Sequence, residues 1–168
     1  MKIGNRFIRS GFAGLLLTTG QAVTATDVVP THLLGLELAR DIANATLAAC
    51  REKGYQVAVM VTDRSGDPLV VLRDVFTSRQ MIELARGKAN AVVMSGNSSG
   101  ELRENMAQIR AELNELDGVL LLAGGHPIRV AGMLIGAVAV SGAPGGELDA
   151  ACAQAGLEAV QERLEFID

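Results

Sequence analysis

The sequence predicts an α+β domain in which helices cover an antiparallel, five-stranded sheet. β-branched apolar runs bounded by Gly, Pro and Asp are typical of strands, and they alternate with longer segments whose apolar residues recur at helical spacing. The strands follow one another through short turns, which favours hairpins over parallel βαβ units. The order along the chain is one helix, two strands, two helices, three strands and one helix.

The first part of this order is a helix followed by a hairpin. Apolar residues recur at helical spacing over 33–53, and Gly54 is the residue expected to end this helix. The apolar runs 56–62 and 68–73 are separated by Asp-Arg-Ser-Gly-Asp, a sequence typical of turns. We therefore expect these two runs to pair.

Two helices come next. Ser78 is a candidate N-cap for a helix over 79–95, which Gly96-Asn97 would end. Ser98 or Ser99 would begin a polar helix that runs to about residue 113, with Glu101, Arg103, Glu104 and Arg110 on a solvated face.

Three strands and a final helix complete the domain. The strands are predicted over 119–123, 128–130 and 133–140, where Gly-Gly-His-Pro and Ala-Gly form the breaks. The last helix is expected to start near Glu147, because the carboxylates of Glu147 and Asp149 suit a helix N-terminus.

Residues 1–25 have the layout of a secretory signal peptide. Three basic residues open this segment, a short apolar run follows over 11–17, and a Val-Thr-Ala cleavage site ends at Ala25. The run is too short to cross a bilayer, although an uncleaved anchor is the alternative. We expect a periplasmic or secreted protein with one domain over 26–168.

The charge of the exported chain excludes two classes of partner. Cleavage after Ala25 would leave 143 residues, and the net charge of −4 would become −7 because the signal carries three basic residues and no acidic one. An acidic surface argues against nucleic acid and anionic membranes. No later run is long and apolar enough to cross a membrane.

The chain holds few residues that could bind a metal or a haem iron. It has two histidines, so one protomer cannot form a multi-histidine metal site. Haem iron is normally held by His, Met, Cys or Tyr, which leaves His126, His32 and the methionines as candidates. His126 lies in the Gly-Gly-His-Pro turn beside exposed backbone N–H groups, and the alternative is that it is a solvated turn residue.

Several motifs, in a consistent order and spacing, resemble the GlcG/HbpS family of haem-binding-protein-like domains. The resemblance covers about 36–166 and implies a profilin-like sandwich with the N- and C-terminal helices on one face. It also implies binding of haem or a related small molecule, and assembly into a homo-oligomer. The motifs are LAACREKGYQVAVMVTDRSG (47–66), LRD (72–74), GKANAVV (87–93), GGHPI (124–128), IGAVAVSGAPGG (135–146) and ELDAACAQAGLEAV (147–160).

One segment departs from this family pattern. Relatives usually carry Gly-Pro-His-Thr before the second helix, and here the segment is Phe76-Thr77-Ser78-Arg79. The histidine of that motif is therefore missing from this chain.

Two basic residues and two glycines are candidate ligand-binding residues. Lys88 lies on or beside the apolar stripe of its helix, so it either extends outward to solvent or presents its ammonium to a ligand or a buried carboxylate. Arg73 could hold a carboxylate or a haem propionate, or pair with Asp74. Gly124-Gly125 allows close approach to the backbone. We predict an anion-recognising pocket between this turn and the helix of Lys88.

Cys50 and Cys152 are the two cysteines of a chain expected in an oxidising compartment. The strand order implied by the resemblance brings the two helix ends that carry them to the same edge of the sheet. We expect a disulfide, and the alternative is two buried free thiols.

These observations predict a secreted small-molecule-binding protein, for haem or an anionic metabolite, without catalysis of its own. One alternative is an enzyme or accessory protein of glycolate or organic-acid oxidation, which the resemblance to GlcG implies, with Lys88 or His126 as the acid–base residue. The other alternative is an oligomeric scaffold, because apolar helix surfaces left on a small domain favour assembly.

Overall fold

The computed structural model describes residues 29 and 31–165, so the predicted signal peptide over 1–25 lies outside the described residues. All described helices and strands belong to one unit that begins at Thr31. No described helix is long and apolar enough to cross a membrane. The elements are α1 (Leu36–Glu52), β1 (Ala58–Asp63), β2 (Pro68–Arg73), α2 (Gln80–Ser95), α3 (Ser99–Asn105), α4 (Arg110–Leu113), β3 (Gly125–Val130), β4 (Met133–Ser141), α5 (Gly146–Glu158) and α6 (Gln161–Glu165).

The strands form one antiparallel sheet in the order β2-β1-β4-β3. The predicted hairpin β1–β2 is confirmed, and so is the pairing of the last two predicted strands. The predicted break at Gly-Gly-His-Pro is wrong in part, because β3 begins at Gly125 and so includes His126 and Pro127. β1 and β4 are buried along nearly their whole length because both faces of the sheet are covered by helices. β2 and β3 are the two edges.

The expectation of five strands is wrong, because residues 119–123 do not join the sheet. The amide of Leu120 donates to the carbonyl of Gly87 in α2 at 3.0 Å, and the amide of Leu122 turns back onto the carbonyl of Leu120. Gly87 makes this possible, since a Cβ there would lie 2.7 Å from Cβ of Leu120. The run therefore packs against a helix and cannot extend a sheet edge.

Two predicted helices are each divided in the structure. The polar helix ends at Asn105 and resumes at Arg110 as the four-residue α4, and the last helix is broken between α5 and α6. The turn between α3 and α4 uses tight bonds such as Ile109 N–H to the carbonyl of Met106. No residue of α4 is buried, so no packed face holds the two short helices in one line.

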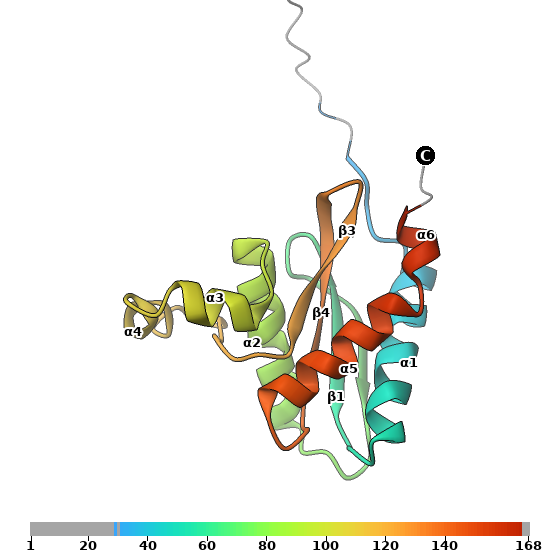
Figure 1. The fold of residues 1–168 in the computed structure, drawn as a ribbon, viewed down its shortest axis with the longest axis horizontal. Helices are drawn as coiled ribbons and strands as arrows, with labels where there is room; N and C mark the ends of the chain where they lie inside the picture. Colours follow the sequence, from blue (N-terminus) through green and yellow to red (C-terminus); the bar gives the residue numbers. More distant parts are fainter. Residues whose placement is uncertain (1–28, 30, 166–168) are drawn as a thin grey trace, which may run out of the picture. The chain divides into compact units, whose positions relative to one another are not determined.

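The helices cover both faces of the sheet (Figure 1). α1 and α5 contact each other on one face, as predicted for the terminal helices, and α2 covers the other face. The main core lies under α1 and α5, where Ile42, Val59 and Val138 are fully buried. The layer under α2 is made of small residues together with Met60 and Val92, so that helix lies close to the sheet.

The predicted disulfide is present and ties α1 to α5. The Cα atoms of Cys50 and Cys152 lie 5.3 Å apart, within the range that a disulfide requires, and both residues are fully buried. One turn before Cys50 in α1 and one turn after Cys152 in α5, the two helices are so close that a Cβ at Gly156 would overlap the side chain of Thr46. Glycine at 156 is therefore needed for this helix crossing.

Candidate functional site

Gly124 directly precedes β3, and Gly125 and His126 are its first two residues, against α2 and α5. We call these three residues the Gly-Gly-His turn, after the turn predicted from the sequence, although two of them are paired in the strand. Gly124 has a φ of +129°, and a Cβ there would lie 2.7 Å from Nζ of Lys88 and 2.8 Å from the carbonyl oxygen of Val140. At Gly125, a Cβ would lie 2.9 Å from Cγ2 of Val92. Close packing therefore requires both glycines, in addition to any part that they have in ligand binding.

Lys88 and Asp149 form a buried ion pair directly beneath this turn. Nζ of Lys88 lies 2.7 Å from Oδ2 of Asp149 and donates to the carbonyl of Val140 at 2.8 Å. The other carboxylate oxygen of Asp149 accepts from the amide of Ala143 at 3.0 Å. Lys88 therefore does not extend outward to solvent, and its ammonium is paired with a buried carboxylate.

Burial raises the pKa of Asp149, and its bonds with Lys88 and Ala143 oppose that shift. The pair joins α2 to the first turn of α5 and to the end of β4. It thereby fixes the position of Glu147, which lies in the same turn of α5.

Arg73 is not brought to the Gly-Gly-His turn. It ends β2, and because β3 is the opposite edge, three strand spacings of about 4.8 Å separate the two strands. Its guanidinium donates to the carbonyls of Asp74 and Thr77, so it braces the loop that follows β2. The carboxylate of Asp74 is held instead by Arg51 and by the amide of Val57.

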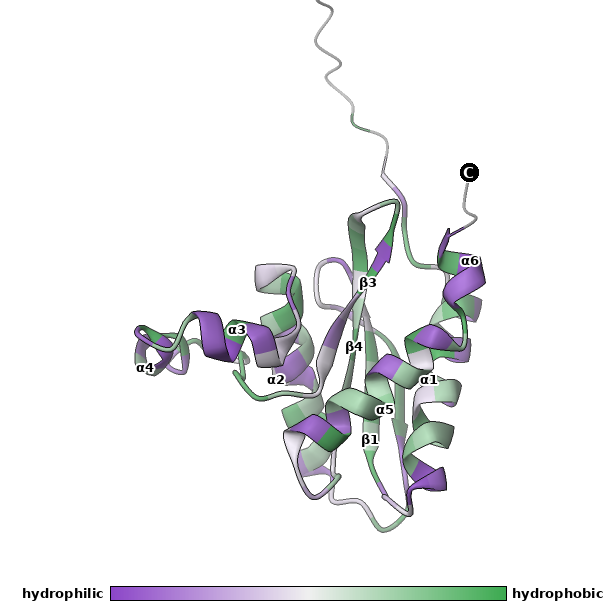
Figure 2. Ribbon diagram, viewed as in Figure 1, coloured by the Kyte–Doolittle hydropathy of each residue, from purple (hydrophilic) through white to green (hydrophobic). Residues whose placement is uncertain are grey.

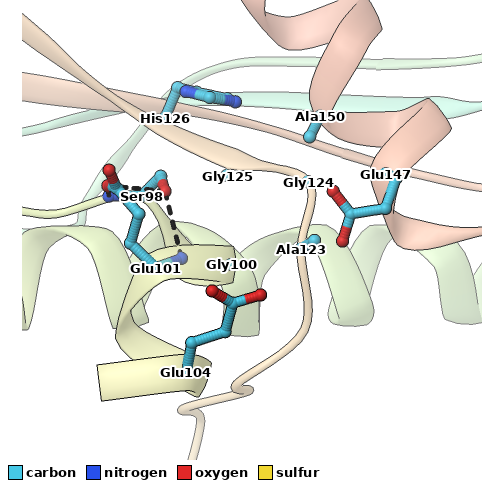
Figure 3. Close-up of a pocket in the computed structure, with 10 residues that line it drawn as sticks. All are labelled: Ser98, Gly100, Glu101, Glu104, Ala123, Gly124, Gly125, His126, Glu147 and Ala150. Carbon is cyan, nitrogen blue, oxygen red and sulfur yellow. Dashed lines mark hydrogen bonds between the residues drawn. The ribbon is translucent and has the colours of Figure 1, made fainter. Parts of the chain in front are cut away.

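A hollow of about 200 Å³ opens beside His126, and we call it the His126 hollow (Figure 3). Three carboxylates line it together with the imidazole. Glu101 and Glu104 come from α3, and Glu147 comes from α5, with its carboxylate directed toward the centre in this view. The other lining residues are Ser98, Gly100, Ala123, Gly124, Gly125 and Ala150.

The three glutamates are not among the site residues that the sequence predicts. The helical pattern places Glu101 and Glu104 on a solvated face, and it marks Glu147 only as a helix start. The three-residue spacing of Glu101 and Glu104 could have indicated a shared helix face. Their convergence with His126 depends on how α3, α5 and β3 pack together, which the local sequence does not reveal.

The electrostatics of the His126 hollow favour a neutral imidazole beside the charged carboxylate of Glu101. Burial lowers the pKa of His126, although Glu101 and Glu147 partly offset the shift. The pKa of Glu101 is lowered by its hydrogen bonds with the side chain and backbone of Ser98, which form a capping box at the start of α3. A neutral imidazole has a free lone pair and can bind a metal ion.

A second hollow, of about 460 Å³, adjoins the first, because Ala123 and Glu147 line both. We call it the adjoining hollow. Met81, Leu84 and Leu122 give it apolar walls, and Arg103 contributes a guanidinium. No ion pair is formed by Arg103 with any residue in the described part of the chain.

Within residues 31–165, no group of three His, Cys, Asp or Glu side chains is arranged to hold a metal ion. The other histidine, His32, is exposed before α1 and lines neither hollow. His126 is therefore the histidine that a ligand in either hollow would meet.

An antiparallel four-stranded sheet with helices on both faces defines a small α+β domain. The family described as "Haem degrading protein HbpS-like" matches residues 34–158. This chain belongs to that family. No curated protein sequence matches it.

Solved structures agree with this assignment. The chain is 35% identical to HbpS, with a TM-score of 0.74, over 82% of this chain and 96% of HbpS. It is 33% identical to a double Glu-to-Asp variant of Streptomyces reticuli HbpS, with a TM-score of 0.74, over 84% and 96% of the two chains. A complex of PduOC with haem shares the fold at 24% identity and a TM-score of 0.69, over 76% and 95%.

Proposed function

We propose that this protein is an exported haem-binding protein that uses the His126 hollow and has no catalysis of its own. The observation that carries the proposal is His126 itself, a half-buried imidazole with a lowered pKa at the mouth of a hollow. Membership of the HbpS-like family supports haem as the ligand, and so does the haem complex of PduOC, which has the same fold.

The residues present fit haem, because the imidazole of His126 would hold the iron at a partly open surface. The His126 hollow is too small to enclose a porphyrin, so the macrocycle would also occupy the apolar adjoining hollow. The carboxylates of the His126 hollow repel propionates, whereas Arg103 can receive one. Bound haem would supply the iron; the chain supplies the imidazole, the apolar wall and a guanidinium.

The predicted ligand residues have different parts in this proposal. His126 contacts the ligand, and Gly124 and Gly125 line the hollow with their backbone. Lys88 acts by fixing Asp149 and the first turn of α5. Arg73 braces the β2–α2 loop, and we assign it no contact with the ligand.

Replacing His126 with Ala is expected to weaken haemin binding about tenfold or more, because it removes the imidazole that would hold the iron. The Soret band should shift or broaden in the same titration. His32→Ala is the matched control, since His32 is exposed and outside both hollows. Equal affinity and identical spectra for wild type and His126→Ala would contradict the proposal.

The affinity for haemin in the same titration should fall in acid. A protonated imidazole cannot bind iron, and burial places the pKa of His126 below its ordinary value of 6.5. Binding should therefore be constant at neutral pH and fall only as the pH drops through this lowered pKa. A His126→Ala variant should lose that dependence.

A second candidate is an organic-acid-binding or organic-acid-oxidising protein. It is favoured by Arg103 at the adjoining hollow, next to the uncapped first turn of α5. Calorimetry and turnover assays with a panel of 2-hydroxy acids distinguish this candidate from haem binding. Binding of an acid that Arg103→Ala abolishes, without any response to haemin, would replace the first proposal.

We also propose export with cleavage after Ala25. The disulfide supports an oxidising compartment, in which such bonds persist. N-terminal sequencing of the exported protein identifies the cleavage site, and a mature chain that begins at Met1 would contradict cleavage.

A further inference from the structure

The loop that joins β2 to α2 carries the two most exposed large apolar side chains of the described residues. Val75 is 81% exposed and Phe76 is 88% exposed, and we call these two residues the tip. The loop lies at the end of the domain where α1 ends, and it is hydrophobic where it turns (Figures 1 and 2). Only three aromatic residues follow residue 25, and one of them is placed in water here instead of in the core.

Hydrogen bonds hold the tip in a defined turn. The amide of Thr77 donates to the carbonyl of Asp74 at 3.1 Å, which places the tip at the two central positions of a β-turn. The guanidinium of Arg73 donates to the carbonyls of the same two residues, and Arg51 anchors the carboxylate of Asp74. Central turn positions are usually taken by Gly, Asn, Asp, Ser or Pro. This turn instead presents two large apolar side chains to solvent.

The segments around the tip are basic, although the chain as a whole is acidic. Segments 51–53 and 73–79, which the bond between Arg51 and Asp74 joins, contain four basic and two acidic residues. One of the two acidic residues, Asp74, is buried. The net charge that argues against anionic membranes is therefore distributed unevenly, and the tip lies among an excess of positive charge. The basic residues are all exposed, and they are Arg51, Lys53, Arg73 and Arg79.

We infer that the tip docks onto an anionic lipid bilayer, with Val75 and Phe76 inserted into the interface and the basic residues against the headgroups. Inserted apolar area and cations near an anionic surface both contribute to binding of this kind. A protein partner fits the tip less well, because a standard interface buries about 800 Å² of each partner and the tip is two side chains on a turn. Docking through so few groups is weak and reversible.

This docking goes beyond the proposed function and does not depend on it. The tip lines neither the His126 hollow nor the adjoining hollow. Haemin binding and vesicle binding should therefore be lost separately. His126→Ala should bind vesicles as the wild type does, and variants of the tip should bind haemin as the wild type does.

The test is sedimentation of the exported protein with vesicles of equal parts phosphatidylglycerol and phosphatidylcholine. The wild type should bind, and it should bind less in high salt or to phosphatidylcholine alone, because both weaken the electrostatic attraction. Val75→Ser/Phe76→Ser should weaken binding about tenfold or more, since the apolar area of both side chains no longer inserts. Leu33→Ser is the matched control, because Leu33 is 73% exposed and lies before the opposite end of α1.

A single tryptophan gives a second measurement, because the chain contains none. The fluorescence of Phe76→Trp should shift to shorter wavelength when the anionic vesicles are added, and acrylamide should quench it less. Leu33→Trp should keep its emission. Adding Lys53→Glu/Arg79→Glu to Phe76→Trp should raise the lipid concentration needed for the shift about tenfold or more, because two attractive charges become repulsive.

Three results would overturn the inference. They are a wild type that does not bind the anionic vesicles, a Val75→Ser/Phe76→Ser variant that binds them equally well, and a Phe76→Trp emission that the vesicles leave unchanged. A shift of that emission with rising protein concentration in the absence of lipid would also overturn it, because protein would then cover the tip.

Discussion

Replacing Lys88 with Ala is expected to lower the free energy of unfolding by about 3–5 kcal/mol at neutral pH, because it leaves the carboxylate of Asp149 buried without its counter-ion. Lys88 and Asp149 are each 4% exposed or less at the side chain, so water cannot replace the lost partner. Urea unfolding measures the change. Arg86→Ala is the control on the same helix, since its pair with Glu83 is solvated and contributes little.

The Lys88→Ala variant should recover part of its stability in acid. Burial already raises the pKa of Asp149, and removing Lys88 raises it further. A group whose pKa is higher in the folded state is stabilising at low pH, and this contribution is lost as the pH rises through the folded pKa. The double variant Lys88→Met/Asp149→Asn should be more stable than Lys88→Ala, because no charge is then buried. A Lys88→Ala variant as stable as Arg86→Ala would show that the pair is not buried in solution.

Removing the disulfide should have an effect of similar size. The bond closes a loop with a sequence separation of 102, for which chain entropy gives about 4.7 kcal/mol of stabilisation. Cys50→Ala/Cys152→Ala should therefore unfold at much lower urea concentration than the oxidised wild type.

Reduction supplies the internal control for the disulfide. A reductant should destabilise the wild type and leave the double alanine variant unchanged. Thiol titration under denaturing, non-reducing conditions should find no free sulfhydryl in the wild type. Two free thiols in that assay, or a variant as stable as the wild type, would contradict the bond.

The features predicted correctly from the sequence are mostly those set by neighbours along the chain. The β1–β2 hairpin follows from two β-branched runs and the turn at 63–67, and α2 ends at Gly96, which has the positive φ that glycine favours. The run 119–123 has an equally strong strand pattern. It fails to form a strand because Gly87, more than thirty residues earlier, offers a backbone carbonyl and space against α2.

The candidate site likewise combines a feature that the local sequence reveals with contacts between distant residues. Lys88 is unusual in the sequence itself, because its helical spacing places a charge on an apolar stripe. Its partner lies 61 residues later in the chain, and no local pattern identifies Asp149 among the acidic residues. The acidic lining of the His126 hollow depends in the same way on three elements that meet only in the folded chain.

The bond between Cys50 and Cys152 also gives the chain a ring topology. All four strands, residues 103–118 and the residues that line the His126 hollow lie on a closed covalent circle, from which two tails emerge. One tail leads back through the first turns of α1 to the predicted signal peptide, and the other is the rest of α5 followed by α6. Tags, fusions or truncations that stop outside the circle leave it closed, whereas a single backbone cut within residues 103–118 opens it without releasing either piece.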